Sequence, residues 1–276
     1  MFVPREVPPD LSPFLRSLWY LEASSERRFE KILPSPRAHL IVNLGQPYRQ
    51  LARGLTPTGV HLEGPFLAGV QSQYLINENP TDLRMLVAQF AAEGVGLFAH
   101  AAPESLVDAV LPAANLIPGV VELAARGHDN SDPESLLDGL VDLLRAARHG
   151  PAPDSGVTRA RIALEDARPA SISQLAHAEG LSPRALSARF YRACGITPKR
   201  FSEVARFEAL VSSLAGRDRL PTWTELVEEY GYYDQPHVSR AFTRFAGSPP
   251  ARFLRDLAEF GLEYATFVPL DHPAHR

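Results

Sequence analysis

Two basic segments near the C-terminus carry the side chains best suited to binding a partner. Arginine makes fork-shaped contacts with phosphate and guanine, glutamine pairs with adenine, and serine donates to phosphate. The first segment contains Arg184, Ser187, Ala188, Arg189 and Arg192, and the second contains Gln235, Pro236, His237, Ser239, Arg240 and Arg244. Neither segment contains an acidic residue. We therefore expect both to contact DNA; the plainer interpretation is a pair of helical hairpins with solvated arginines.

The place of each residue along its segment predicts its role. The first turns of a recognition helix lie nearest the base edges, and phosphate contacts fix its register. We expect base contacts from Arg184, Ser187, Ala188, Gln235, Pro236 and His237. We expect phosphate contacts from Arg189, Arg192, Ser239, Arg240 and Arg244, with Arg189 and Arg240 taken as equivalent positions.

An internal repeat places the two segments in the same structural context. Gly180 and Gly231 are 51 residues apart, whereas Phe190 and Phe242 are 52 apart. The second copy therefore has one extra residue in the turn just after its glycine. A repeated fold tolerates such an insertion because the register is kept on either side of the turn.

Each copy predicts a helix, a short turn with glycine, and a second helix. Ser171 and Thr222 are suited to cap the first helices, and Ser182 with Pro183 is suited to begin the second helix of the first copy. Asp234 or its neighbour begins the corresponding helix of the second copy. This is the helix-turn-helix pattern, whose second helix enters the major groove of DNA.

The second copy resembles the signature of the AraC/XylS transcriptional regulators through residues 231–253, which read GYYDQPHVSRAFTRFAGSPPARF. Residues 180–190 and 195–201 are similar to the signature in the first copy. The resemblance covers roughly residues 157–257 and implies a seven-helix DNA-binding domain in which a linker helix over 198–215 joins two units. It also implies double-stranded DNA and RNA polymerase as partners. The N-terminal half is similar to the sensor region of some members, in stretches such as Leu40–Gly45.

Composition indicates an ordinary soluble protein of two domains. The chain has 276 residues, of which 45% are hydrophobic and 22% charged, and its net charge is −4. Residues 151–276 contain 16 Lys and Arg against 15 Asp and Glu, so the negative charge lies in the first half. The single cysteine, Cys194, excludes an intrachain disulfide, and no apolar run reaches the ~18–20 residues of a membrane span. We expect a cytoplasmic protein without a membrane partner.

We expect an α+β protein in which a β-rich, barrel- or cupin-like domain with helices precedes an all-α domain. A linker candidate at residues 149–156 divides a sensor or dimerisation domain (1–150) from the DNA-binding domain (151–258), which a tail (259–276) follows. Gly- and Pro-bounded apolar runs predict strands at residues 40–44, 66–70 and 83–90. Helical spacing is present at residues 103–110, 117–126 and 133–148, whereas residues 11–21 fit helix or strand.

The N-terminal half offers a speculative effector pocket made of aromatic side chains. Its candidates are Trp19, Tyr20, Phe66, Tyr74 and Phe90, although aromatic residues in a small β domain also serve as plain core. His39, His61, Glu63 and His100 match no metal-ligand spacing, so we expect neither a metal nor another cofactor. The apolar stripe of residues 133–148 either forms a homodimer seam or packs on the barrel.

The sequence thus favours a sequence-specific, effector-responsive transcription regulator that is not an enzyme. No Ser-His-Asp set, phosphate-binding glycine loop or metal triad is evident, and Cys194 has no visible catalytic partners. One alternative is an enzyme or metal-binding domain fused to a DNA-binding module. Another is a protein-interaction adaptor with vestigial helix-turn-helix units. The effector, the operator and the choice between activation and repression stay open.

Overall fold

The computed structural model describes residues 1–25, 28–51, 60–129, 132–214, 221–261 and 267–270. Its strands are β1 (Phe2–Arg5), β2 (Leu15–Ser24), β3 (Phe29–Ile32), β4 (Ala38–Asn43), β5 (Tyr48–Leu51), β6 (Val60–Leu62), β7 (Phe66–Ala68), β8 (Leu75–Glu78), β9 (Asp82–Phe90), β10 (Val110–Pro112) and β11 (Phe267–Leu270). Its α-helices are α1 (Pro103–Leu106), α2 (Val120–Asp129), α3 (Pro133–Ala147), α4 (Ser155–Leu164), α5 (Ile172–Ala178), α6 (Pro183–Cys194), α7 (Pro198–Leu214), α8 (Trp223–Tyr230), α9 (Gln235–Phe245) and α10 (Pro250–Phe260). The α+β fold agrees with the prediction.

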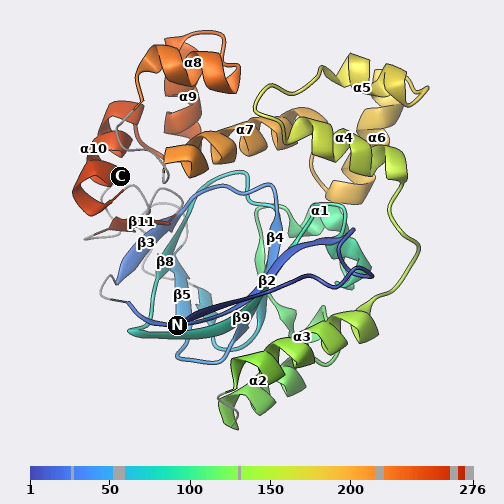
Figure 1. Ribbon diagram of the computed structural model, residues 1–276, viewed down its shortest axis with the longest axis vertical. Coiled ribbons are helices and arrows are strands. Elements are labelled where there is room, and N and C mark those ends of the chain that lie inside the picture. Colours follow the sequence, from blue (N-terminus) through green and yellow to red (C-terminus); the bar gives the residue numbers. More distant parts are fainter. Residues whose placement is uncertain (26–27, 52–59, 130–131, 215–220, 262–266, 271–276) are drawn as a thin grey trace.

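The strands form two antiparallel sheets that enclose the centre of the molecule (Figure 1). Sheet A has the order β1-β2-β9-β4-β7-β10, and sheet B has the order β11-β3-β8-β5-β6. Because side chains alternate along a strand, neighbours on β2 face opposite ways: Leu18 and Tyr20 join one core cluster, while Trp19 joins another. The first cluster lies under α2 and α3, and the second lies between the sheets.

Helix α3 packs on sheet A, which decides between the two predicted uses of its apolar stripe. Leu137, Leu140 and Leu144 are fully buried in the same cluster as Leu40 and Leu86 of the sheet. Asp132 caps the helix by accepting the Ser135 N–H at 3.1 Å. Since the stripe is covered by the chain itself, it is not available as a dimer seam.

The secondary structure of residues 11–21 and 103–110 is decided by strand pairing with distant parts of the sequence. Residues 15–24 form β2, which pairs along its length with β9, so the undecided segment is largely strand. The predicted helix over 103–110 ends at Leu106, and Val110 begins β10 by pairing with Ala68 of β7. The chain reverses at Asp108, whose φ is +58°, and its carboxylate accepts the Ser72 N–H at 2.7 Å. These pairings override the local helical spacing.

Part of the predicted tail is also ordered into the fold. Residues 267–270 form β11 and pair antiparallel with β3, from Phe267 opposite Ile32 to Leu270 opposite Phe29. Val268 and Leu270 are buried, as the alternation of a half-covered strand requires. Residues 262–266 and 271–276 of this tail lie outside the described residues. The C-terminal end of the chain thus returns to a sheet built from the N-terminal half.

In the described part of the C-terminal half, the seven helices α4–α10 lie on one side of the sheets (Figure 1). Helix α7 joins two core clusters: Phe201 packs with Phe190 of α6, and Phe207 packs with Phe242 of α9. It ends at Leu214; Ala215, the predicted last residue, lies outside the described residues. Among the described residues, no helix is long and apolar enough to cross a membrane.

Candidate nucleic-acid interface

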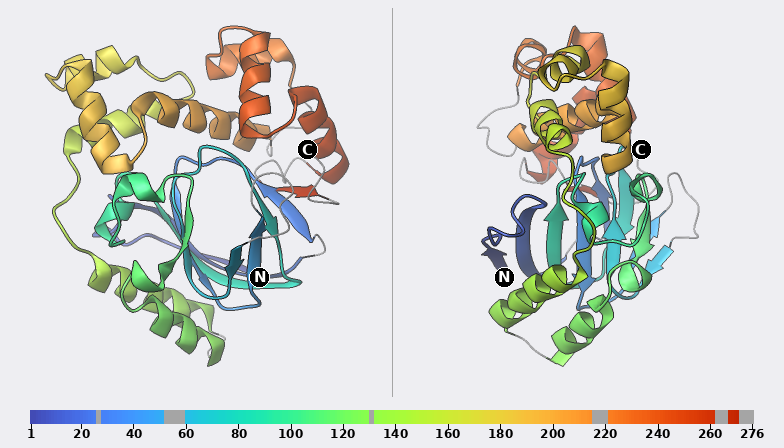
Figure 2. Two further views of the ribbon diagram at one scale, coloured as in Figure 1. Left: turned by 180° about the vertical axis from the view of Figure 1, so that it is seen from behind. Right: turned by 90° about the vertical axis from the view of Figure 1, so that its right-hand side faces the viewer.

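The predicted DNA-contacting segments form two helices, α6 and α9, on the same side of α7, and these are the two predicted recognition helices. Both lie in front of α7 in the left view of Figure 2. Their inner faces are buried through Leu186 and Phe190 in α6 and through Val238 and Phe242 in α9. Their opposite faces are left open, which is the arrangement of a helix that enters a DNA groove.

The first unit begins and ends each helix where its sequence indicates. Ser171 and Gln174 form a reciprocal capping box at the start of α5, and Gly180 follows the helix with φ +65°. Ser182 caps α6 by accepting the Ala185 N–H at 3.1 Å, and Pro183 occupies the first helical position. The side-chain caps and the glycine between them therefore fix where α5 ends and where α6 begins.

The second unit has the same kinds of helix caps, and its turn is one residue longer. Thr222 and Glu225 form the capping box of α8, and Gly231 ends that helix in the left-handed region at φ +62°. Asp234 caps α9 by accepting the His237 N–H at 2.7 Å. Because Ser182 and Asp234 are the corresponding caps, the repeat offset of 52 residues applies from this point to the end of both recognition helices.

The six predicted base-contacting residues all lie in the first half of their helices. Arg184, Ala188, Gln235 and Pro236 are exposed, and Ser187 and His237 are half-buried. The His237 ring packs edge-on against Tyr232, with the ring centroids 5.1 Å apart, and Nδ1 accepts the Tyr233 N–H at 3.4 Å. With Nδ1 so occupied, the neutral ring carries its proton on Nε2.

The five predicted phosphate-contacting residues differ in whether another residue already binds their side chains. Among the described residues, Arg240 is exposed and has no partner, and Arg192 reaches only its own helix at the Ala188 carbonyl oxygen, 3.4 Å away. Arg244 pairs with Glu203 at 2.7 Å. Arg189 pairs with Asp154, the cap of α4, at 3.0 Å, and Ser239 is half-buried.

The predicted equivalence of Arg189 and Arg240 is wrong. The offset of 52 that relates Phe190 to Phe242 places Arg240 opposite Ala188 and Arg189 opposite Ala241. Ala241 is buried, and Arg189 turns toward α4 and its cap. Arg189 therefore lies at the flank of its helix, whereas Arg240 lies on the open face.

A family model described as a helix-turn-helix domain matches residues 175–256, which run from α5 into α10 and so contain both units. The chain carries an AraC-type helix-turn-helix domain. It is a DNA-binding transcription regulator. A second model, described as a domain of unknown function (DUF6597), matches residues 5–112, which include most of both sheets. No curated protein matches the chain significantly.

Solved structures of ToxT from Vibrio cholerae resemble the chain in three dimensions. ToxT bound to (E)-4-(8-methylnaphthalen-1-yl)but-3-enoic acid gives a TM-score of 0.51 at 8% identity and covers 87% of this chain and 99% of that chain. A 1.65 Å structure of ToxT gives 0.48 at 8% identity over 87% and 98%. ToxT with a bound unsaturated fatty acid gives 0.46 at 8% identity over 91% and 96%. The first comparison shows that the fold is shared.

The far ends of both recognition helices of the AraC-type domain rest against the sheet-containing half. At the end of α6, a Cβ on Gly195 would overlap the carbonyl oxygen of Pro103 in α1. Just after α9, a Cβ on Gly247 would overlap the ring of Tyr74. The Lys31 ammonium donates to the carbonyl oxygen of Ala246, the residue that caps the end of α9, over 2.7 Å. The first turns of α6 and α9 lie at the opposite ends of these helices, where Arg184, Gln235 and Pro236 are exposed.

Further ion pairs hold helices α4 and α7 to the sheet-containing half. Arg161 of α4 bonds Glu93 at 2.7 Å in a fully buried pair. Arg200 of α7 reaches Asp108 at 3.2 Å and also bonds Ser72. Glu208 of α7 pairs with Arg37 and accepts the Ser35 hydroxyl at 2.9 Å; burial, the largest influence, raises the pKa of Glu208. None of these residues was singled out from the sequence, because a lone charge carries no sign of a distant partner.

The five predicted effector residues do not line a single pocket. Tyr20 and Phe90 are sealed in the core beneath α2 and α3, and Tyr74 lies at the contact with Gly247 and Lys31. Only Trp19 and Phe66 face the space between the sheets, where they join Tyr48, Leu62, Met85 and Val87. Strand alternation explains the split, since adjacent residues such as Trp19 and Tyr20 must point to opposite faces.

The histidines and the cysteine considered in the sequence lie on different elements, with His39 on β4, His61 on β6 and Cys194 on α6. His39 faces the space between the sheets and contacts Gln89 at 3.0 Å, and burial lowers the pKa of His39 to about 4. His61 lies on sheet B, and His100 stacks on His149 with ring centroids 4.2 Å apart. Across the described residues, no group of three or more His, Cys, Asp or Glu side chains could hold a metal ion. Burial raises the pKa of Cys194 well above its usual range.

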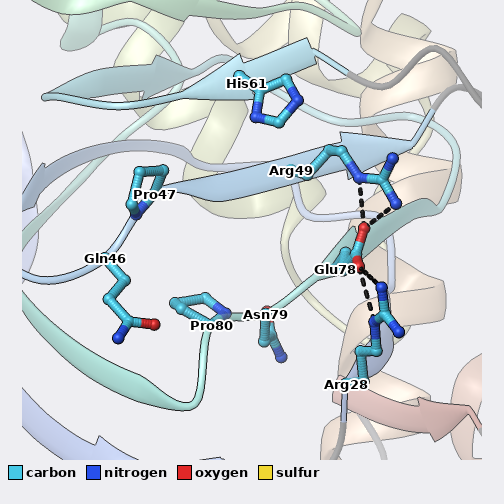
Figure 3. A pocket seen from close by; sticks show the side chains of 8 residues that line it. All are labelled: Arg28, Gln46, Pro47, Arg49, His61, Glu78, Asn79 and Pro80. Carbon is cyan, nitrogen blue, oxygen red and sulfur yellow. Dashed lines mark hydrogen bonds and ion pairs between the residues drawn. The ribbon is translucent and has the colours of Figure 1, made fainter.

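An open pocket of about 560 Å³ lies at one end of sheet B (Figure 3). Glu78 stands between two guanidinium groups there, and it bonds Arg28 at 2.7 Å and also pairs with Arg49. Gln46 and Pro47 line the other side, and Gln46 also lines a neighbouring pocket of about 680 Å³ that includes Leu83, a member of the cluster between the sheets. The second pocket thus borders the cluster between the sheets at Leu83.

Proposed function

We propose that this regulator reads DNA with both recognition helices at once, in successive major-groove segments on one face of the duplex. Helix α7 has 17 residues and is therefore about 25 Å long. Helix α6 packs on the first part of α7 through Phe190 and Phe201, and α9 packs farther along through Phe242 and Phe207, so α7 separates the two units. The spacing we propose for the two segments is about one DNA turn, roughly 34 Å. The observation that carries the proposal is that the first turns of both helices are open while their far ends are docked.

Selection of bound sequences from a random DNA pool tests sequence-specific reading. The full chain should enrich two short conserved segments about 10 bp apart, one for each recognition helix. A variant with Arg184→Ala and Arg240→Ala should lose the enrichment, and Val121→Ala, on the exposed side of α2, serves as the surface control. Enrichment of one segment, or of none, would contradict reading by both units.

The arginine roles are tested on the selected operator. Arg240→Ala should weaken binding almost uniformly across sequences and lower the salt slope by about one, because a free exposed arginine neutralises one phosphate. Arg189→Ala is the matched control, since that guanidinium is already engaged by Asp154. We propose Arg184 and Gln235 as base readers, so alanine there should relax preference at one base pair by ~1–3 kcal/mol. Equal salt slopes for Arg189→Ala and Arg240→Ala would contradict these roles.

We further propose that a small molecule binds between the two sheets and changes DNA affinity. Trp19, Ile41 and Leu83 face this space and are still partly exposed, so solvent reaches it. Glu30 and Tyr48 add polar groups; burial raises the pKa of both, and the charge of Glu30 contributes at Tyr48. The lining suits a mainly apolar molecule with one hydrogen-bonding group. The ToxT structures with a bound fatty acid and a bound naphthalenyl butenoic acid support the idea of such a ligand.

Thermal-shift screening of the full chain tests the effector proposal. A ligand that raises the melting temperature should also change operator affinity, and only by its differential affinity for the two states. Trp19→Ala should abolish the shift, whereas Val121→Ala should keep it. An unchanged shift in Trp19→Ala would place the ligand elsewhere, and a ligand without effect on DNA affinity would contradict effector control.

We propose no catalysis, and we propose RNA polymerase and a second copy of the chain as partners in the cytoplasm. In the described part of the sheets, the titratable groups are dispersed or paired and do not form a nucleophile, base and orienting set. Effector recovered from the protein should be chemically unchanged, and a converted ligand would contradict the proposal. Sedimentation of the operator complex, with and without polymerase, tests both partners.

A further inference from the structure

Tyr233 stands in the turn that leads into α9 and has no counterpart in the first unit. Leu181 and Tyr232 correspond, because each follows the glycine that ends the supporting helix and each packs into its unit's core. Ser182 and Asp234 correspond as the caps of the recognition helices. The one-residue insertion in the second copy is therefore Tyr233 itself.

The side chain of Tyr233 is almost entirely in solvent. It is 89% exposed, which is more than any other large apolar or aromatic side chain in the described part of the protein. Among the described residues, its side chain makes no hydrogen bond and no ring contact, whereas its backbone N–H donates to His237 Nδ1. Folding therefore gains almost nothing from this aromatic ring, whereas tyrosine at a binding surface offers both contact area and a hydrogen-bond donor.

The backbone on both sides of Tyr233 is held in place. Tyr232 is buried, packs against His237, and lies under the Arg206 guanidinium, 5.5 Å from the ring centroid. Asp234 is fixed by its bond to the His237 N–H. A side chain on such a fixed turn loses little backbone freedom on binding, which preserves affinity.

We propose that Tyr233 donates its hydroxyl to a phosphate that flanks the groove segment read by α9. This inference rests on the proposed function, because it requires α9 to lie in the major groove. The residue precedes the cap of α9 by one position, so its Cα is about 3.8 Å from that of the cap. Turn residues at the start of a recognition helix adjoin the DNA backbone, and tyrosine is among the side chains that bind phosphate oxygens. The second unit then holds one phosphate that the first unit does not.

The test compares full-length wild type with Tyr233→Phe on the selected operator. Removing the hydroxyl should weaken specific binding about 10- to 100-fold, as expected for a hydrogen bond to a charged group. A series of duplexes, each with a single uncharged methylphosphonate, should identify one position where wild type loses a similar factor. On that duplex Tyr233→Phe should cost nothing more.

Two outcomes overturn the inference while leaving the proposed function intact. One is wild-type affinity in Tyr233→Phe, including the case in which only Tyr233→Ala binds weakly. The other is an equal loss for Tyr233→Phe on every methylphosphonate duplex, which means that no single phosphate is its partner. If wild type itself selects no operator, the proposed function fails instead. Variants that bind normally but alter transcription would assign Tyr233 to a protein contact and also refute the phosphate role.

Discussion

The buried pair Arg161–Glu93 provides the sharpest test of how the two halves are held together. The side chains are 2% and 0% exposed, and the Arg161 Nε–Glu93 Oε1 distance is 2.7 Å. Arg161 also bonds Glu165 at 2.8 Å, and one oxygen of Glu93 has no partner in the described structure. Arg161→Met would therefore strand a fully buried carboxylate, whereas Glu93→Gln would leave Arg161 still paired with Glu165.

The burial and pairing of the two side chains set the order in which the variants should lose stability. Arg161→Met should lower the free energy of unfolding by about 3–5 kcal/mol, the usual cost of removing one partner from a buried pair. Glu93→Gln should cost about 1–2 kcal/mol, since the amide oxygen can still accept from Arg161. The double variant should recover part of the loss because no unpaired charge remains at Glu93.

Urea unfolding followed by circular dichroism measures these differences, with Arg159→Met as the matched control. Arg159 lies on the same helix and pairs with Glu179, but its side chain is 60% exposed, so its loss should be the smallest of the series because solvent screens an exposed pair. The reasoning would be refuted if Arg161→Met cost no more than Glu93→Gln, or if the two losses simply added in the double variant.

Three other substitutions test which local and which long-range contacts stabilise the fold. Gly180→Ala and Gly195→Ala both place alanine at positive φ, which costs about 1–2 kcal/mol. Only at Gly195 would the new Cβ also overlap Pro103, so urea unfolding should show a larger loss of stability for Gly195→Ala. Equal losses for the two variants would contradict the docking of α6 on α1. Burial lowers the pKa of Lys31 to about 8, so the folded state binds fewer protons than the unfolded state between pH 8 and about 10.5. The stability of the wild type relative to Lys31→Met should therefore rise with pH across that window. If urea titrations gave the same stability difference at pH 8 and at pH 10.5, burial of the charge would be contradicted. Asp234→Ala should cost about 1 kcal/mol in thermal unfolding through the lost cap of α9, and Asp234→Asn should restore most of it; an equal loss in both would exclude capping as the cause.

The helical domain could be predicted because its signals are local. Capping residues such as Ser171 and Thr222, the glycines at the helix ends, and the repeated inner phenylalanines each act within a few residues of the chain. The first turns of both recognition helices followed from the same pattern. The insertion at Tyr233 was also visible as a shift in repeat spacing, but its exposure required the structure.

The remainder depended on partners that are distant in the sequence. Val110 and Phe267 enter strands only because β7 and β3 offer edges to them, and the sequence around each carries no such sign. The effector residues were chosen by type alone, although strand alternation separates Trp19 from Tyr20. The partner of Arg189 was missed because Asp154 lies 35 residues away and was interpreted as linker.

Footprinting of the full chain on its selected operator tests the central claim most directly. The account predicts two protected major-groove segments on one face of the duplex, with centres about one helical turn apart. Inserting 5 bp between them should remove one protected segment, because α7 fixes the distance between the two recognition helices. A single protected segment on the intact operator, or unchanged protection of both after the insertion, would contradict reading by two rigidly joined units.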